Sequence, residues 1–224
     1  MSHSLEYKMI KAVIFDMDGT LIDTEKYYHV CWMEAIRHFG YDVTDEQAYG
    51  LRSLGRPFVQ EYFRELYGPD FDYEKVHAYR KKLMEPLLQE RGIDLKPGAK
   101  ELLTYLKDKG IITAVATATD MERTEKYLKQ LGLYDGFEKI ISARMVERGK
   151  PAPDVYLYAC SQLGLAPSEC MAVEDSPNGV TSAYRAGCRV VMVPDQTQPD
   201  EKLLSMLFAK ADSLLELKDF LSEV

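Results

Sequence analysis

The chain has 224 residues, of which 46% are hydrophobic, so it can bury the core of one large domain or of a domain with an insertion. Its net charge of -8 argues against electrostatic capture of nucleic acid or of anionic membranes. The sequence shows no signal peptide and no apolar run of the roughly 18 residues that a membrane span needs. We therefore expect a soluble, cytoplasmic protein without nucleic-acid or membrane partners, and a monomer by default.

The cysteines are widely spaced and show neither a CxxC pair nor a Cys/His metal-binding spacing. They are Cys31, Cys160, Cys170 and Cys188. We expect free, mostly buried thiols, which fits a reducing compartment. The first eight residues, "MSHSLEYK", are either a vector scar or a short native arm and are left out of the fold prediction.

Short apolar runs rich in β-branched residues alternate along the chain with amphipathic segments. The runs predict buried strands at Ala12–Phe15, Ile111–Ala116, Lys139–Ser142, Met171–Val173 and Arg189–Val193. The amphipathic segments predict helices at Gly98–Lys109, Met121–Leu131, Val155–Leu163, Asn178–Ala186 and Leu214–Leu221. Strands alternating with helices predict an α/β fold with a Rossmann-like parallel sheet and helices on both faces.

One connection is too long for a simple crossover between strands. From Asp23 to about Leu95 only helical patterns occur, broken by glycine and proline. Because a structureless loop of this length would be unusual, we expect an inserted helical cap domain over the strand ends, with aromatic side chains in its own core. The predicted domains are a core of residues 9–23 and 95–224 and a cap of residues 24–94. Hinges are expected near Ile22–Thr24 and Gly92–Pro97.

Chemically reactive side chains gather at the ends of the predicted strands. Asp16 and Asp18 follow the first strand, and Thr117 ends the second. Glu174 and Asp175 follow the fourth. Lys150 lies in "RGKPAPD", before the next helix. In parallel α/β folds, ligands bind at this edge of the sheet, so the segments are expected to form one site.

This set of residues predicts phosphoryl-transfer chemistry. Crowded carboxylates repel one another unless a cation holds them, and hard oxygen ligands suit Mg²⁺. A lysine, a hydroxyl and backbone amides suit a phosphate group. A carboxylate can then attack phosphorus while a second acid protonates the leaving oxygen.

Several of these residues also allow other interpretations. A calcium loop at "DMDGTLIDTEKY" is disfavoured, since Leu21 and Tyr27 stand where that loop requires Gly and Glu. Glu174 and Asp175 could instead cap the helix that begins near Ser176 and Pro177. Two further residues are expected to be structural: Asp154 as a helix N-cap, and Asn178 as a turn or cap residue.

Four segments in order resemble the four motifs of the haloacid dehalogenase superfamily of phosphatases and phosphomutases. They are "FDMDGTLIDTE", Thr117 in "VATAT", Lys150 in "GKPAPD", and "VEDSPNG". The inserted helices resemble the β-phosphoglucomutase/phosphoglycolate phosphatase branch, and the likeness covers about Ile10 to Val224.

The resemblance implies a role for each matching residue. Asp16 is the expected nucleophile, and Asp18 the general acid and then base, with its backbone carbonyl facing Mg²⁺. Thr117 and Lys150 are expected to bind the phosphoryl group. The implied metal ligands are Asp16, Asp18, Glu174 and Asp175, and the implied cofactor is Mg²⁺. Ala118 is implied to contact substrate, and its neighbours Thr119 and Asp120 could also do so.

Phosphatases and phosphomutases share these motifs, so the resemblance does not choose between the two activities. The residues of the inserted segment are expected to distinguish them. β-Phosphoglucomutases carry a His where this chain has Tyr28, with His29 displaced by about 100° around the helix. We therefore predict a phosphatase acting on a small phosphate monoester such as a sugar phosphate, with His29, Arg52 and Arg56 as candidate substrate contacts. A phosphomutase and a non-catalytic phosphate-binding protein are the alternatives.

Overall fold

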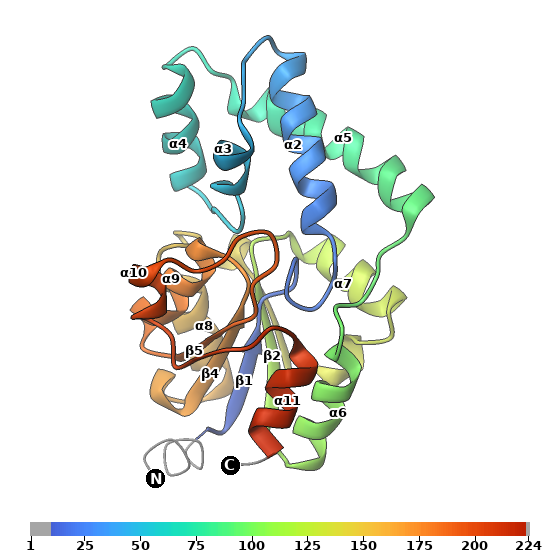
Figure 1. Ribbon diagram of the computed structural model, residues 1–224, viewed down its shortest axis with the longest axis vertical. Coiled ribbons are helices and arrows are strands. Elements are labelled where there is room, and N and C mark those ends of the chain that lie inside the picture. The colour runs from blue at the N-terminus through green and yellow to red at the C-terminus, as the bar shows by residue number, and fades with distance from the viewer. Residues whose placement is uncertain (1–9, 223–224) are drawn as a thin grey trace.

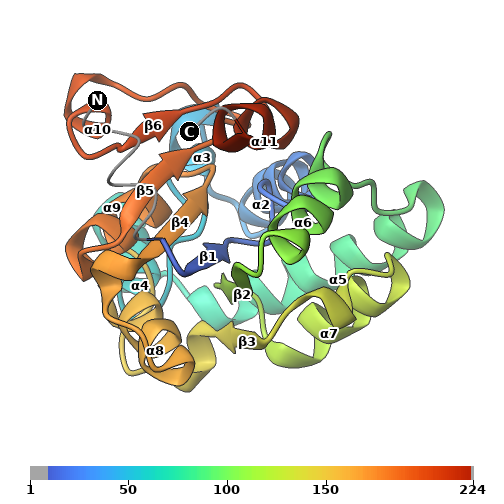
Figure 2. The same ribbon diagram turned by 90° about the horizontal axis from the view of Figure 1, so that it is seen from below.

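The computed structural model describes residues 10–222, so the possible vector scar at residues 1–8 lies outside the described part. A six-stranded parallel sheet with strand order β3-β2-β1-β4-β5-β6 forms its centre (Figures 1 and 2). The strands are β1 Ala12–Phe15, β2 Ile112–Thr117, β3 Lys139–Ser142, β4 Cys170–Glu174, β5 Arg189–Met192 and β6 Ala209–Lys210.

Helices cover both faces of this sheet because successive residues of a strand point to opposite sides. Val13 and Phe15 belong to the core under α6, α7 and α11, whereas Ala12 and Ile14 belong to the core under α8, α9 and α10. These helices are α6 Ala99–Asp108, α7 Met121–Gln130, α8 Asp154–Leu163, α9 Pro177–Ala186, α10 Glu201–Leu204 and α11 Leu214–Ser222. Single 3₁₀ turns lie at Tyr134–Gly136, Ala143–Met145 and Pro167–Glu169. The predicted α/β fold is confirmed.

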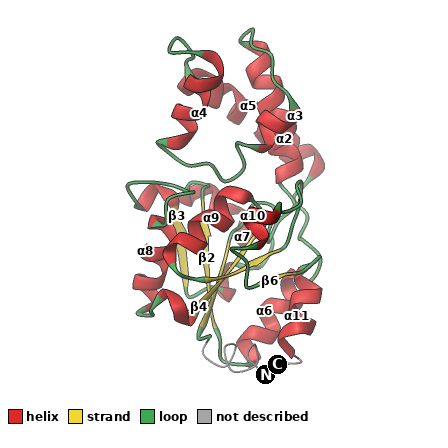
Figure 3. Ribbon diagram, turned by 60° about the vertical axis from the view of Figure 1, so that its left-hand side comes forward, coloured by secondary structure: helices red, strands yellow, loops and turns green. Residues whose placement is uncertain are grey.

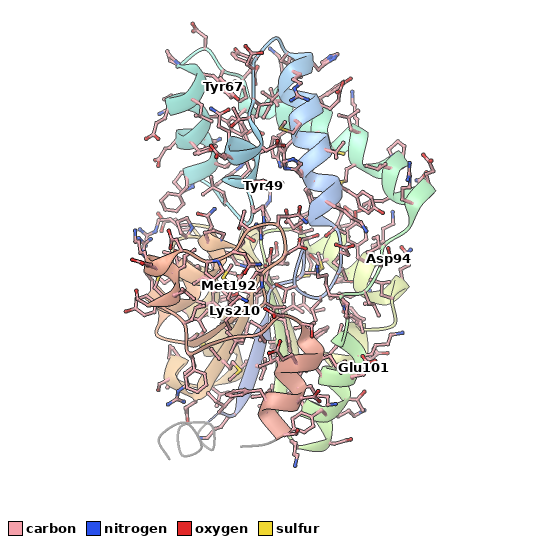
Figure 4. All side chains as sticks on the ribbon, in the orientation of Figure 1. Tyr49, Tyr67, Asp94, Glu101, Met192 and Lys210 are labelled. Atoms are coloured by element: carbon pink, nitrogen blue, oxygen red, sulfur yellow. The ribbon has the colours of Figure 1, made fainter. Side chains whose placement is uncertain are left out.

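Residues 25–91, between β1 and α6, form a helical layer beyond the carboxyl ends of the strands (Figures 1 and 3). Its helices are α2 Glu25–His38, α3 Asp45–Tyr49, α4 Phe58–Tyr67 and α5 Tyr73–Arg91. Tyr49 and Tyr67 lie in this layer, whereas Met192 and Lys210 lie in the sheet below it (Figure 4). Aromatic rings pack inside the layer, as expected: Phe63 stacks on Phe71 with ring centroids 4.6 Å apart.

The chain enters and leaves the helical layer through two adjacent segments. Ile22 and Leu95 form an antiparallel bridge, and the amide of Asp23 donates to the carbonyl of Asp94 at 2.9 Å. These residues coincide with the predicted hinges and with the predicted domain boundaries at 23/24 and 94/95. Both the hinge motion and the division into domains stay predictions.

Some predicted details differ from the structure. Strand β6 and helix α10 were not predicted, because two and four residues are too short to show a periodic pattern. The interpretation of Asp154 as an N-cap was wrong: Pro153 holds the cap position, and Asp154 is the first helical residue, paired with Arg148 at 3.2 Å. The cysteines are free and buried, as predicted. Within residues 10–222, no helix is long and apolar enough to cross a membrane.

Candidate active site

The strand order brings the acidic residues of the first and fourth motifs together. Strand β1 lies between β2 and β4, so Asp16, which follows β1, is flanked by the ends of both neighbours. Thr117 is the last residue of β2 and Glu174 the last residue of β4. The amide of Asp16 donates to the carbonyl of Val173 at 2.9 Å, which holds the acid next to β4. All of these side chains are buried.

Lys150 links two of the acids. Its side chain is fully buried, and Nζ lies 2.5 Å from Oδ1 of Asp16 and 2.6 Å from Oε1 of Glu174. It also donates to the carbonyl of Ala116 at 3.0 Å. Burial opposes the charge, but the two carboxylates hold the pKa of Lys150 above its ordinary value. Lys150 is therefore a fixed cation beside Asp16, with all three of its protons directed by acceptors.

Glu174 is oriented by a second donor that sequence reasoning missed. The hydroxyl of Tyr156, on α8, donates to the same Oε1 atom at 2.6 Å. A Cβ atom at Gly179, in the first turn of α9, would lie 1.9 Å from Oε2 of Glu174, so only glycine leaves room for this carboxylate. Glu174 thus serves to position Lys150, a role in addition to the predicted one at the metal.

Asp18 is held by two hydroxyl groups from different elements. Thr24 donates to Oδ1 at 2.6 Å, and Thr119 donates to Oδ2 at 2.7 Å. Thr24 occupies the N-cap position of α2 but makes no capping bond, since its hydroxyl is used by Asp18. The carboxyl group of Asp18 is therefore oriented independently of Lys150, which suits a separate role in proton transfer.

Three carboxylates form a group that fits a divalent cation. One oxygen from each of Asp16, Glu174 and Asp175 lies within 4.8 Å of the others. Oδ2 of Asp16 and Oε2 of Glu174 are buried, with no hydrogen-bond partner among the described residues. Burial raises the pKa of Asp16, and the charges of Glu174 and Asp175 raise it further, against the opposing effect of Lys150. The carboxylates of this group outnumber the cations beside them, and carboxylate oxygens are hard ligands that suit Mg²⁺.

Asp175 is already paired with a cation from the helical layer. Nη2 of Arg52 lies 2.5 Å from Oδ2 of Asp175 and 2.8 Å from its carbonyl oxygen, and Nη1 donates to Thr197 at 2.8 Å. Burial raises the pKa of Asp175 to about 6, although Arg52 acts in the opposite direction. The cap of α9 is Ser176, so Asp175 does not take the alternative capping role. Asp175 instead pairs with Arg52, a cation from the helical layer.

The other predicted substrate contacts lie around the same cavity, which has a volume of about 260 Å³. Ala118 lines it beside Thr117, whose hydroxyl accepts the amide proton of Thr119 at 3.1 Å. Arg56 lines it too, but pairs with Glu74 at 2.7 Å. His29 pairs with Asp45 at 2.9 Å and stacks on Tyr49, whereas Tyr28 lies against Thr119. Tyr28 and His29, which are adjacent on α2, therefore make different contacts, as expected from their offset of about 100° around the helix.

Two loops join the helical layer directly to the motif that carries Lys150. The amide of Gly55 donates to the carbonyl of Lys150 at 2.8 Å, and the amide of Gly149 donates to the carbonyl of Arg56 at 2.7 Å. A Cβ atom on Gly55 would lie 2.6 Å from Cα of Gly149, so this approach requires glycine.

The interpretation of Asn178 as a turn or cap residue was wrong, because its side-chain amide donates to the carbonyls of Gly50 and Arg52.

Several residues of the site could not be identified from the sequence. Thr24 and Tyr156 contact the acids of the site. Glu25, Arg80 and Arg123 line the cavity. Burial raises the pKa of Glu25, and the charge of Asp175 adds to this effect. The two arginines lie on helices rich in charged residues, and only the packing of those helices shows which charges face inward.

Comparisons with known proteins agree with this geometry. The model of the haloacid dehalogenase-like hydrolase family matches residues 13–193. Hexitol phosphatase B of Escherichia coli (strain K12) is 30% identical over 220 residues, covering 96% of this chain and 98% of that protein. The phosphorylated carbohydrates phosphatase of Thermotoga maritima is 30% identical over 217 residues, covering 95% of this chain and 97% of that protein.

A solved structure with the same architecture holds a sugar phosphate. It is a mutant of CbbY from Rhodobacter sphaeroides in complex with xylulose-(1,5)bisphosphate, and it is 28% identical to this chain with a TM-score of 0.77. The match covers 93% of this chain and 96% of that one. Together with the four motifs and their assembly at one edge of the sheet, these findings show that the chain belongs to the haloacid dehalogenase-like hydrolases.

Proposed function

We propose that this protein is a Mg²⁺-dependent phosphatase that hydrolyses a small phosphate monoester through an aspartyl-phosphate at Asp16. The observation that carries the proposal is the arrangement of Asp16: Oδ1 is neutralised by Lys150, while buried Oδ2 has no partner among the described residues. Such an oxygen, desolvated and on a residue that lines the cavity, suits nucleophilic attack. The phosphatases with which the chain shares 30% identity support the same reaction class.

In the first step, Oδ2 of Asp16 attacks phosphorus and the bond from phosphorus to the leaving oxygen breaks. Asp18, in its protonated form, gives its proton to that oxygen, so the product leaves as an alcohol. The hydroxyl of Thr117 donates to a phosphoryl oxygen, and the charge of Lys150 offsets the negative charge on the phosphoryl group and on Asp16. In the second step, Asp18 takes a proton from water as the water attacks phosphorus, and Asp16 is released with inorganic phosphate. Proton transfer of this kind is worth about 10²–10⁴ in rate.

Asp16, Glu174 and Asp175 would hold Mg²⁺, together with the predicted carbonyl ligand of Asp18. When bound, the ion supplies positive charge that offsets the phosphate and acidic oxygens. Because Arg52 already pairs with Asp175, the guanidinium and the ion would compete for the negative charge of that carboxylate.

The substrate class is proposed from the size of the cavity and from the relatives. A cavity of about 260 Å³ between the helical layer and the strand ends suits a small metabolite. Two relatives are named for phosphorylated carbohydrates or hexitol phosphates, and the CbbY structure holds a sugar bisphosphate. We propose a phosphorylated sugar or a similar polyol ester, bound by residues 24–94 acting as a cap domain.

A phosphomutase remains the second candidate, since it shares the nucleophile and the acid. The orientation of His29 argues against it: its imidazole pairs with Asp45 and stacks on Tyr49. Tyr28, which lies nearest Thr119, cannot act as a neutral-pH base, because burial raises its pKa far above 10. Water is therefore the proposed acceptor of the phosphoryl group. The absence of nucleic-acid and membrane partners, a monomeric state and a cytoplasmic location stay predictions.

The test is release of inorganic phosphate from a panel of hexose phosphates, pentose phosphates, hexitol phosphates and nucleotides, with and without Mg²⁺. We expect Mg²⁺-dependent turnover of at least one sugar or polyol ester, with no turnover by Asp16→Asn. An exposed matched control, Asp135→Asn, should retain full activity. Interconversion of phosphate isomers without phosphate release would instead support the mutase, and binding without either reaction would support a binding protein.

A further inference from the structure

The hydroxyl group of Tyr156 lies deep in the core, yet its partner belongs to the active site. Tyr156 is on α8, is fully buried, and packs with the apolar residues between that helix and the sheet. Its hydroxyl donates to Oε1 of Glu174 at 2.6 Å, its one hydrogen bond with residues 10–222. A phenylalanine would fill the same space without the cost of removing a hydroxyl from water. Packing alone therefore does not account for this oxygen atom.

Tyr156 contacts both members of the buried ion pair beside Asp16. While the hydroxyl reaches Glu174, the face of the ring lies toward Lys150, with 5.3 Å between Nζ and the ring centroid. The face of an aromatic ring carries negative charge density and attracts an ammonium group. Lys150 and Tyr156 come from one short segment, "GKPAPDVY". Replacement of Tyr156 by phenylalanine would remove the hydroxyl and keep the contact between the ring and the ammonium group.

Glu174 and Asp16 compete for the charge of Lys150. Nζ lies 2.6 Å from Oε1 of Glu174 and 2.5 Å from Oδ1 of Asp16. The hydroxyl of Tyr156 donates to the same Oε1 atom, so both lone-pair sites of this oxygen are used. An acceptor that is shared between two donors attracts each of them less strongly. The hydroxyl thus limits the pull of Glu174 on Lys150 and leaves more of the positive charge for Asp16.

We propose that Tyr156 is a positioning residue, whose hydroxyl holds Glu174 so that Lys150 stays beside the nucleophile during phosphoryl transfer. The inference rests on the proposed phosphatase function and adds a residue to its machinery. Without the hydroxyl, Glu174 draws Nζ of Lys150 toward itself. Asp16 and the phosphoryl group then lose part of the charge that offsets their own. Tyr156 does not line the cavity, so this loss slows the chemical step and leaves substrate binding unchanged.

The experiment removes one hydroxyl at a time. Tyr156→Phe is compared with wild type and with Tyr105→Phe. This matched control keeps its ring and loses the hydrogen bond of 2.8 Å to the carbonyl of Leu221, between α6 and α11. Phosphate release from glucose 6-phosphate, sorbitol 6-phosphate and p-nitrophenyl phosphate is measured with Mg²⁺ present, to give kcat and KM. Circular dichroism and melting temperatures show whether each variant folds.

A second pair of variants tests whether the hydroxyl acts through the charge of Glu174. In Glu174→Gln the charge that the hydroxyl balances is absent, so adding Tyr156→Phe should change kcat less than about twofold. The double variant also covers the case in which Tyr156→Phe alone does not fold. It must then fold, with a melting temperature close to that of Glu174→Gln, because no carboxylate is left short of a donor.

We expect Tyr156→Phe to lower kcat about 10-fold on every ester that wild type hydrolyses, with KM changed less than about twofold. Tyr105→Phe should retain wild-type kinetics. A wild-type kcat in Tyr156→Phe, a change confined to KM, or an undiminished effect in the Glu174→Gln background overturns the inference alone. No release of phosphate by wild type from any ester overturns the proposed function and the inference with it.

Discussion

The guanidinium of Arg52 lies 2.5 Å from Oδ2 of Asp175, although the two residues are 123 positions apart in the chain. Asp175 follows β4 in the core, whereas Arg52 belongs to the helical layer. One carboxylate of the acid group is therefore neutralised by a cation from the proposed cap. A metal ion at this group would compete with that arginine for Asp175.

Removal of this competing cation should strengthen metal binding. We expect Arg52→Gln to bind Mg²⁺ about 10-fold more tightly at pH 8, because one charge-assisted hydrogen bond no longer opposes the ion. Isothermal titration calorimetry measures the change. Arg56→Gln is the matched control, since Arg56 pairs with Glu74 and not with the acid group. Weaker Mg²⁺ binding by Arg52→Gln would contradict competition.

The raised pKa of Asp175 predicts how stability depends on pH in the metal-free protein. Burial raises this pKa to about 6 from an ordinary value of 3.8. The folded state thus binds the proton more tightly than the unfolded state, so the stabilisation is present below about pH 4 and is lost as pH rises through about 6. The loss is up to about 3 kcal/mol. Added Mg²⁺ should reverse it, because the ion binds the charged form.

Melting temperatures from pH 4.5 to 7.5, with and without Mg²⁺, check this prediction. The stabilisation by Mg²⁺ should grow as pH rises, and Asp175→Asn should reduce it strongly. A stabilisation that is constant with pH would mean that Asp175 is already charged at low pH in the metal-free protein.

Loss of Lys150 should impair both stability and activity. Its removal leaves Asp16 and Glu174 as buried carboxylates without their shared cation, so we expect Lys150→Met to lower the free energy of unfolding by about 3–5 kcal/mol. Urea denaturation measures this change. The double variant Lys150→Met/Glu174→Gln should recover part of the stability but none of the activity. Recovery of activity would show that Lys150 is needed only for folding.

The hydroxyl of Thr119 should matter for proton transfer by Asp18. We expect Thr119→Val to lower kcat about 10- to 100-fold with a smaller change in KM, since Asp18 loses one of two oriented hydrogen bonds. Thr104→Val serves as the control, because Thr104 is exposed and donates only to a backbone carbonyl. The effect should be smaller for a substrate with a more acidic leaving alcohol, which needs less help from Asp18. An equal loss on both substrates would argue against this role.

Local patterns predicted the sheet and the motif residues because both depend on short stretches of sequence. Apolar runs such as Ala12–Phe15 are recognisable in isolation, and parallel strand ends meet at one edge whatever lies between them. The positions of Asp16, Thr117 and Glu174 follow from that rule. Strand β6, with two residues, offered no such pattern.

The remaining site residues depend on how the inserted helices pack on the core. Arg80 lies in a helix rich in charged residues, and nothing local distinguishes it from its exposed neighbours. Its burial results from the packing of α5 against Tyr28 and Trp32 of α2. Likewise, Tyr156 meets Glu174 only because α8 packs on the sheet. Such contacts between distant segments need the folded structure.

The central claim is that Asp16 carries the phosphoryl group during turnover. The most direct measurement is rapid acid quench of the protein with Mg²⁺ and its best ester, labelled in the phosphoryl group, followed by proteolysis and mass spectrometry. We predict the label on the peptide that contains Asp16 in wild type and none in Asp16→Asn. Label on another residue, or turnover by Asp16→Asn at the wild-type rate, would contradict the account.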